Sequence, residues 1–300
     1  METVFVDYAP KGVQFIYTYK SLAHWGDWGY VGPVTLEERL LHIQEAKKVL
    51  GTNIDWISDT MSNDLKHAIG DASNSEFLLD PDGKIVQMRL WSDPEALRQD
   101  LAALVGPVDN PTLVSDLDMP EGPPLMEAPT GIVPRIELEG DFNALISVAQ
   151  VDSSPNPFYA KLRVAAESEL LTTGKGRLYL GYFLDPIYDV HWNNDVSPVA
   201  YEIDAPEGIT LTPARGFGPE VDAPSDSDPR EFLLDVDRGN STEPVPITLH
   251  YYGCTDDWCI LVSQEYLITW NIDRDGGTQI VNGQMGFGEI DPRMLDQYPE

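Results

Sequence analysis

Apolar and polar positions in the first hundred residues alternate between strand-like and helix-like spacing. Residues 13–19 are rich in β-branched and aromatic residues, which predicts a buried strand. Thr35 followed by Glu38 is a capping box, and apolar positions at helical spacing continue to Gly51, which predicts a helix. This half is therefore expected to be an α/β module, with strands at 13–19 and 54–58, helices at 36–50 and 62–69, a hairpin at 75–90 around Asp82-Gly83, and a helix from Pro94 to about 105.

From about residue 158 the helical spacing fades and short strand patterns take its place. Turn-forming sequences rich in glycine, proline and aspartate separate these patterns. Several short strands with no helix between them are typical of a β-sandwich. The expected strands are 161–166, 177–184, 209–212, 231–236, 245–252 and 260–270.

Prolines recur between residues 107 and 134, and proline resists both helix and central strand. Residues 107–157 are therefore predicted to be a Pro-rich acidic linker or a long surface strap. The glycine-rich residues 273–300 are predicted to be a loosely ordered tail. The predicted division is an α/β module at 1–106, the linker, a β-sandwich at 158–272, and the tail.

The chain of 300 residues carries 50 Asp and Glu against 19 Lys and Arg, a formal net charge of −31. This balance argues against a nucleic-acid-binding protein, which needs a basic surface, and against binding to anionic membranes. No apolar run is long enough to insert across a membrane. Residues 107–300 hold 34 acidic and 10 basic residues, a net charge of −24, which indicates either the solvated surface of an exported protein or recognition of a cationic partner.

The first half resembles a redoxin of the thioredoxin superfamily, near its deiodinase-like branch. The resemblance rests on residues 15–25, 35–39, 59–64 and 77–86 in this order. It implies that residues 2–8 end a helix and that the superfamily's central strand and cysteine-containing turn would fall before Met1. Either Met1 is internal to a longer chain, or the module has lost this strand. Residues 1–106 contain no cysteine. Because dithiol exchange needs a thiolate, this incomplete module is predicted to be catalytically silent.

The second half resembles the immunoglobulin-like N-terminal domain of the DsbD family of thiol–disulfide interchange proteins. The resemblance rests on residues 181–184, 190–193, 204–209 and 248–254, together with Cys259. It implies a redox pair, Cys254 and Cys259, on adjacent strands of a hairpin. By position, Phe217 is the aromatic cap that this family places over the pair, and Trp258 is expected to add to the shielding. The resemblance also implies a periplasmic or exported protein.

Cys254 and Cys259 are the only cysteines of the chain, and the residues around them also support a hairpin. Opposed residues of an antiparallel pair lie close enough for a disulfide. The closed loop has only six residues, so its bridge contributes about 2 kcal/mol, less than one between distant strands. A redox switch and a structural staple both remain open. Asp256 and Asp257 oppose a thiolate, so the pair is expected to wait as a disulfide until a partner's thiolate attacks it.

Other polar residues offer weaker candidates. His250 shares a strand face with Cys254 and, with Cys259, could supply three ligands for copper or zinc, but the spacing matches no standard site, so no metal and no cofactor are predicted. The stretch His191-Trp192-Asn193-Asn194 is either a polar cluster beside the pair or a turn with a packed tryptophan. His24 is interpreted as a packing or loop residue.

These observations predict a thiol–disulfide exchange protein that passes electrons through the Cys254–Cys259 pair. The expected partner is a thioredoxin-like or other redox protein, with no nucleic acid and no membrane insertion. The alternative is a non-enzymatic binding or scaffold protein with a vestigial redoxin module and a structural disulfide. The first residues lack the basic and apolar regions of a signal peptide, so the extracytoplasmic location is expected from the resemblance alone.

Overall fold

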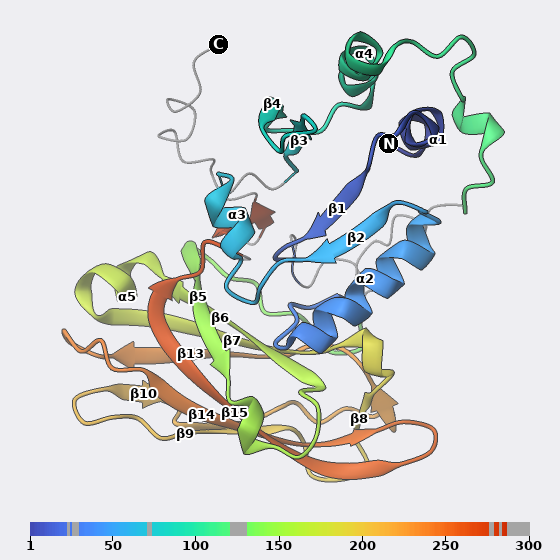
Figure 1. Ribbon diagram of the computed structural model, residues 1–300. Coiled ribbons are helices and arrows are strands. Elements are labelled where there is room, and N and C mark those ends of the chain that lie inside the picture. Colours follow the sequence, from blue (N-terminus) through green and yellow to red (C-terminus); the bar gives the residue numbers. More distant parts are fainter. Residues whose placement is uncertain are drawn as a thin grey trace. The chain divides into compact units, whose positions relative to one another are not determined.

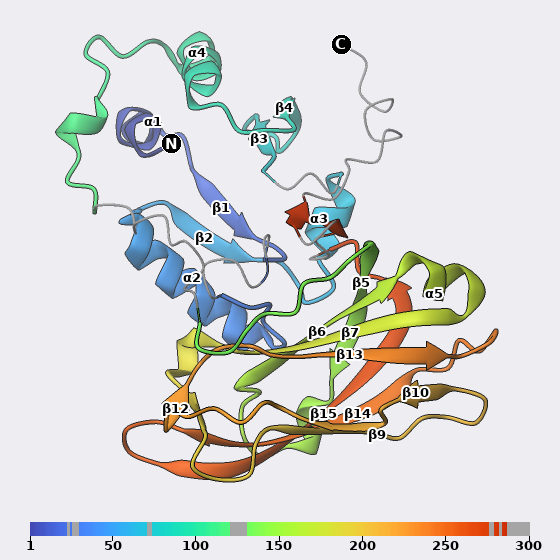
Figure 2. The ribbon, with the colours of Figure 1, turned by 180° about the vertical axis from the view of Figure 1, so that it is seen from behind.

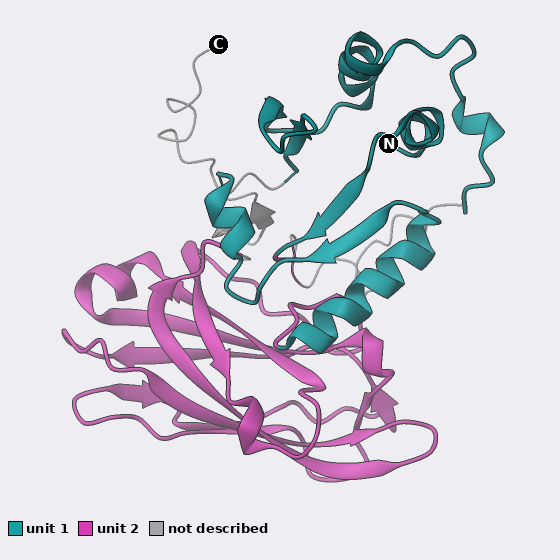
Figure 3. Ribbon diagram, in the orientation of Figure 1, with its two compact units in different colours: residues 1–20, 35–125 teal, residues 21–34, 126–300 magenta. Residues whose placement is uncertain are grey.

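The computed structural model describes residues 1–22, 25, 30–70, 74–120, 131–275, 279–281 and 284–286. The chain divides into two compact units (Figure 3). Unit 1 comprises residues 1–20 and 35–125, and unit 2 comprises residues 21–34 and 126–300. The segment 21–34 therefore interrupts unit 1 in sequence and belongs to unit 2.

Unit 1 contains a β-α-β element built from β1 (Ile16–Tyr19), α2 (Leu36–Leu50) and β2 (Asp55–Ser58) (Figure 1). The two strands pair in parallel. The predicted limits of α2 are confirmed: Thr35 Oγ1 accepts the Glu38 N–H at 3.2 Å, and Gly51 ends the helix with a φ of 60°. The other elements of unit 1 are α1 (Glu2–Tyr8), α3 (Asp64–Ala68), β3 (Glu76–Leu79), β4 (Ile85–Arg89), α4 (Pro94–Val105) and short 3₁₀ helices at Ala9–Lys11 and Val114–Asp116.

The predicted hairpin and last helix of unit 1 are also confirmed. Asp80 accepts the N–H groups of Asp82 and Lys84 in the β3–β4 turn, and Asp93 accepts two N–H groups at the start of α4. Within the described residues, however, β3–β4 and β1–β2 form two separate two-stranded sheets. Unit 1 is thus a mixed α/β unit, and its redoxin fold stays a prediction.

Unit 2 is an antiparallel β unit. Its described strands form one 13-stranded sheet, with the order β10-β13-β7-β6-β5-β15-β14-β8-β12 along its main path. The strands are β5 (Asp141–Ala149), β6 (Ala160–Glu167), β7 (Lys175–Leu184), β8 (His191–Asn193), β9 (Ala200–Ile203), β10 (Thr210–Thr212), β11 (Arg215–Phe217), β12 (Ser225–Asp226), β13 (Arg230–Asp237), β14 (Val245–Cys254), β15 (Cys259–Ile272), β16 (Gln279–Val281) and β17 (Gln284–Gly286), with α5 (Ser168–Thr173) and 3₁₀ turns at Val151–Ser153 and Pro186–Tyr188.

The prediction of a linker over 107–157 is wrong for its C-terminal part. β5 lies inside that range and pairs with both β6 and β15. The preceding residues Ile136 and Leu138 pack against Ala165 and Tyr179, so this part of the Pro-rich segment covers a face of the sheet. The tail prediction also changes, because β16 pairs with β5; residues 287–300 lie outside the described part of the chain.

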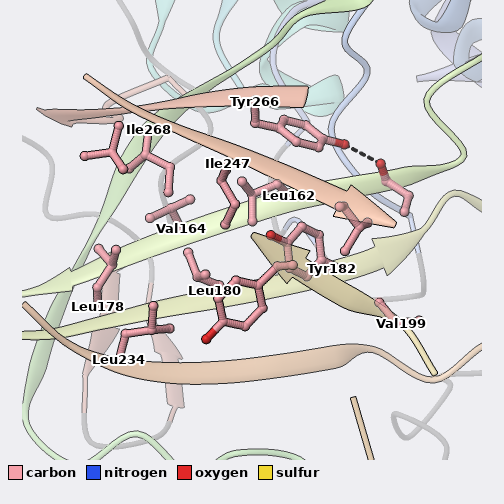
Figure 4. Packing of buried hydrophobic residues seen from close by; sticks show 14 of the residues in the cluster. Leu162, Val164, Leu178, Leu180, Tyr182, Val199, Leu234, Ile247, Tyr266 and Ile268 are labelled. Carbon is pink, nitrogen blue, oxygen red and sulfur yellow. Dashed lines mark hydrogen bonds between the residues drawn. The ribbon is translucent and has the colours of Figure 1, made fainter. Parts of the chain in front are cut away.

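The sheet of unit 2 folds back so that β6 and β7 face β14 and β15 (Figures 1 and 2). Figure 4 shows the core between them, in which Leu162 and Val164 from β6 lie near Ile247 from β14 and Ile268 from β15. All four side chains are buried. Because side chains alternate along a strand, this inner face fixes which residues of β14 and β15 point outward.

Tyr182 sits fully buried in this core, and no described residue accepts or donates a hydrogen bond at its hydroxyl. A buried hydroxyl without a partner costs free energy, so Tyr182→Phe is expected to raise the free energy of unfolding by about 1 kcal/mol. The matched control is Tyr251→Phe, because the Tyr251 hydroxyl donates to Gln264 Oε1 at 2.6 Å. The free energy of unfolding of this control is expected to fall by about 1 kcal/mol. Guanidinium unfolding measures both changes, and a loss in Tyr182→Phe would contradict the expectation.

Candidate functional site

The β14–β15 hairpin positions the two cysteines. Its ten cross-strand pairs run in register from Val245 opposite Ile268 to Cys254 opposite Cys259. Ile247, Leu249 and Tyr251 point into the core, so alternation puts Cys254 and Cys259 on the outward face at the last pair before the turn. The Thr255 N–H donates to the Trp258 carbonyl at 2.9 Å and closes that turn.

The two cysteines form a disulfide, with a distance of 4.1 Å between their Cα atoms. The feasible cross-strand bridge expected from the sequence is therefore confirmed. The two residues differ in accessibility: Cys254 is 5% exposed, whereas Cys259 lies at the surface. An incoming thiol therefore meets Cys259 first.

Strand β8 runs along the other edge of β14 and brings polar groups to the disulfide. His191 lies opposite Cys254, and the Asn193 side-chain amide donates to Cys259 Sγ at 3.3 Å. Trp192 points the other way, is 1% exposed, and packs with its ring centroid 5.1 Å from that of Tyr251. The stretch is therefore in part a polar cluster beside the cysteine pair and in part the site of a packed tryptophan, because alternate residues point to the disulfide and to the core.

His250 does not complete a metal site with the cysteines. Its Nδ1 lies 2.8 Å from Ser263 Oγ, directly across the hairpin and four residue pairs away from the disulfide. Among the residues that the structure describes, no group of three or more His, Cys, Asp or Glu side chains is arranged to hold a metal ion.

Phe217 and Trp258 do not cover the disulfide. Phe217 shares its outward face, but it lies opposite Ala200, which in turn lies opposite His250, so it is two strands away from β14. Its ring is 57% exposed and has the Arg215 guanidinium 5.1 Å from its centroid. The Trp258 ring packs on the core side, 5.5 Å from Tyr159. The sulfur of Cys259 is thus more open than the sequence suggests.

A buried hydrogen-bond network that the sequence analysis missed supports the hairpin from inside. Gln264 is completely buried, and its side-chain amide exchanges hydrogen bonds with the backbone of Ala160 at 3.3 Å. The Tyr251 hydroxyl donates to Gln264, and burial raises the pKa of Tyr251 well above its ordinary value, so the phenol keeps its proton. A glutamine at an inward position between Val262 and Tyr266 is the sequence signal for this network.

The polar cluster of unit 1 has a structural role. Arg39 is buried and donates to the carbonyl groups of Asp59 and Thr60 and to Asn63 Oδ1. Burial disfavours the charge of Asp59, but backbone N–H groups at the start of α3, among them that of Lys66, outweigh this effect and lower the pKa of Asp59. Arg39 and Asp59 therefore fix the loop between β2 and α3. His24, the candidate from the first half of the sequence, lies outside the described residues.

In the part of the chain that the structure describes, no helix has the length and apolar character needed to cross a membrane. Comparisons of the chain with protein-family models, with curated proteins and with solved structures found no match.

Proposed function

We propose that the protein exchanges its Cys254–Cys259 disulfide with the thiols of a thioredoxin-like partner. One observation carries the proposal: an accessible sulfur, Cys259, is joined across a hairpin to a buried one, Cys254. An accessible disulfide is open to attack by a thiolate. The Asn193 amide, which donates to Cys259 Sγ, favours the thiolate form of that residue once the bond is broken.

The exchange needs no further reagent. A partner thiolate attacks Cys259 Sγ, a new sulfur–sulfur bond forms between partner and Cys259, and Cys254 leaves as a thiolate that takes a proton from water. The second cysteine of the partner then attacks the sulfur of the partner's first cysteine, which is bonded to Cys259 in the mixed disulfide. Cys259 leaves as a thiolate and takes a proton. The partner ends as a disulfide and the protein as a dithiol, after two electrons and two protons have moved. The dithiol passes the electrons on by the reverse steps.

The finer assignment of unit 2 is part of this proposal. An antiparallel sheet that folds around one core, with a disulfide at the end of its longest hairpin, supports an immunoglobulin-like domain similar to the N-terminal domain of the DsbD family. A disulfide also fits an oxidising, extracytoplasmic compartment. No catalytic role is proposed for unit 1, because it contains no cysteine.

Two measurements on the full chain test the proposal. The reduction potential of the pair is expected to lie above about −300 mV, and reduced thioredoxin is expected to reduce it. A thioredoxin variant that keeps only its first cysteine is expected to attack the oxidised wild-type protein and stay bound as a mixed disulfide, and after an acid quench peptide mapping is expected to find this mixed disulfide on Cys259 and far less on Cys254. A lower potential together with no reaction would identify the disulfide as a structural staple and favour the scaffold alternative.

A further inference from the structure

The outward side of β8, β9, β11, β14 and β15 forms one surface around the disulfide, called the cystine face below. It continues from Cys259 through Leu261 and Tyr252 to His250, and across β9 to Phe217. Leu261 and Phe217 are the two most exposed large apolar side chains among the described residues of unit 2, at 58% and 57%. Exposed apolar side chains beside a reactive group are typical of a surface that receives a protein partner.

The charges on this face are almost all negative. Asp256 and Asp257 are exposed in the turn between the two cysteines, and Glu265 is exposed on β15. Arg215 is the only lysine or arginine in these five strands, and its guanidinium lies 3.2 Å from the Glu202 carboxylate. The apolar residues and the disulfide are therefore bordered by carboxylates.

We infer that the cystine face receives a partner whose reactive cysteine is surrounded by apolar side chains and bordered by lysine or arginine. This inference rests on the proposed function and adds the chemistry of its partner. Opposite charges around two apolar centres speed the encounter and orient it, while a partner with acidic borders is repelled. The acidic composition of residues 107–300 thereby gains a specific role next to the disulfide, beyond keeping the surface solvated.

Synthetic thiols isolate this charge effect. Three pentapeptides carry a central cysteine with a leucine on each side. Both terminal residues are lysine in the first peptide, glutamate in the second and glutamine in the third. The rate at which each reduces the oxidised full chain, expressed per thiolate, is measured at about 10 mM and about 1 M salt, where the screening length falls from about 30 Å to about 3 Å. The lysine peptide is expected to react about 10-fold faster than the glutamate peptide at low salt, and the two rates are expected to converge at high salt.

A charge-matched pair of variants locates the effect. The variant Asp256→Asn/Asp257→Asn/Glu265→Gln is expected to lose the preference for the lysine peptide. The control Glu169→Gln/Glu207→Gln/Asp235→Asn removes three exposed carboxylates elsewhere on unit 2 and is expected to keep it. Equal rates for the lysine and glutamate peptides, or the same loss in both variants, would overturn the inference while leaving disulfide exchange intact. If neither the peptides nor reduced thioredoxin reduce the disulfide, the proposed function falls and this inference falls with it.

Discussion

Replacing Lys161 by methionine is expected to lower the free energy of unfolding by about 3–5 kcal/mol, because it leaves a buried carboxylate without its cation. Lys161 and Asp185 are 1% and 0% exposed, and Nζ lies 3.6 Å from Asp185 Oδ2. The ammonium group also donates to the Phe158 carbonyl and lies 5.4 Å from the Tyr188 ring. Guanidinium unfolding of the full chain, with hydrogen exchange of the β6 and β7 amides, measures the loss in unit 2.

Two further variants separate the buried charge from simple loss of a side chain. Lys161→Met/Asp185→Asn removes both charges and keeps an acceptor for the Ile187 N–H, so it is expected to recover most of the stability. Lys175→Met breaks an exposed ion pair with Asp237 and is expected to leave the unfolding midpoint unchanged. If Lys161→Met leaves the unfolding midpoint unchanged, as Lys175→Met is expected to do, the expectation that burial makes the Lys161–Asp185 pair important for stability is wrong.

Arg230→Met is expected to cause a loss of similar size, about 3–5 kcal/mol, at the edge of the sheet that carries β8. The Arg230 and Asp226 side chains are 2% and 6% exposed and form two hydrogen bonds, at 2.9 and 2.7 Å. The guanidinium also lies 5.4 Å from the Trp192 ring and donates to Asn194 Oδ1. Because Asn193 lies between these two residues, the variant is also expected to weaken the hydrogen bond to Cys259.

The pH dependence of the same variant identifies the carboxylate concerned. Burial raises the pKa of Asp226, but hydrogen bonds from Arg230 and Asn194 outweigh it and lower the pKa below its ordinary value of 3.8. A lowered pKa contributes stability above pH 3.8 that disappears as the pH falls through the folded-state value. The difference between wild type and Arg230→Met is therefore expected to be full at pH 7 and to shrink below pH 3.8. A constant difference down to pH 2 would assign the loss to packing against Trp192.

The sequence predicts best those features that depend on neighbouring residues. Thr35 and Asp93 cap their helices through N–H groups two or three positions away, so a local pattern reveals them. The disulfide is predictable for the same reason, because a single hairpin joins its cysteines. Strand alternation could also have revealed that Trp258 packs on the core side, since it precedes the outward-facing Cys259.

Features that depend on distant pairing escape such patterns. β5 lies within a proline-rich segment whose composition suggests a linker, yet β6 and β15 supply partners on both of its sides. β8 has three residues, too few for a periodic signal, and its place beside β14 is fixed by Gly253 and Cys254. The hydrogen bond from Asn193 to Cys259 joins residues 66 positions apart, so no local sequence pattern predicts it.

The in-register pairing of β14 with β15 limits how far the backbone has to move when the disulfide opens. Nine backbone-paired positions beyond the cysteines hold the hairpin together whether or not its sulfurs are bonded. Opening the bond is therefore expected to require little reorganisation of the backbone, so the reduced form should keep the architecture of the oxidised one. In the proposed exchange, a donor of electrons and an acceptor of electrons would therefore meet the same surface. Which of the two reacts would then depend on their own reduction potentials and charges, because the shape of this surface would not differ between the oxidised and the reduced protein.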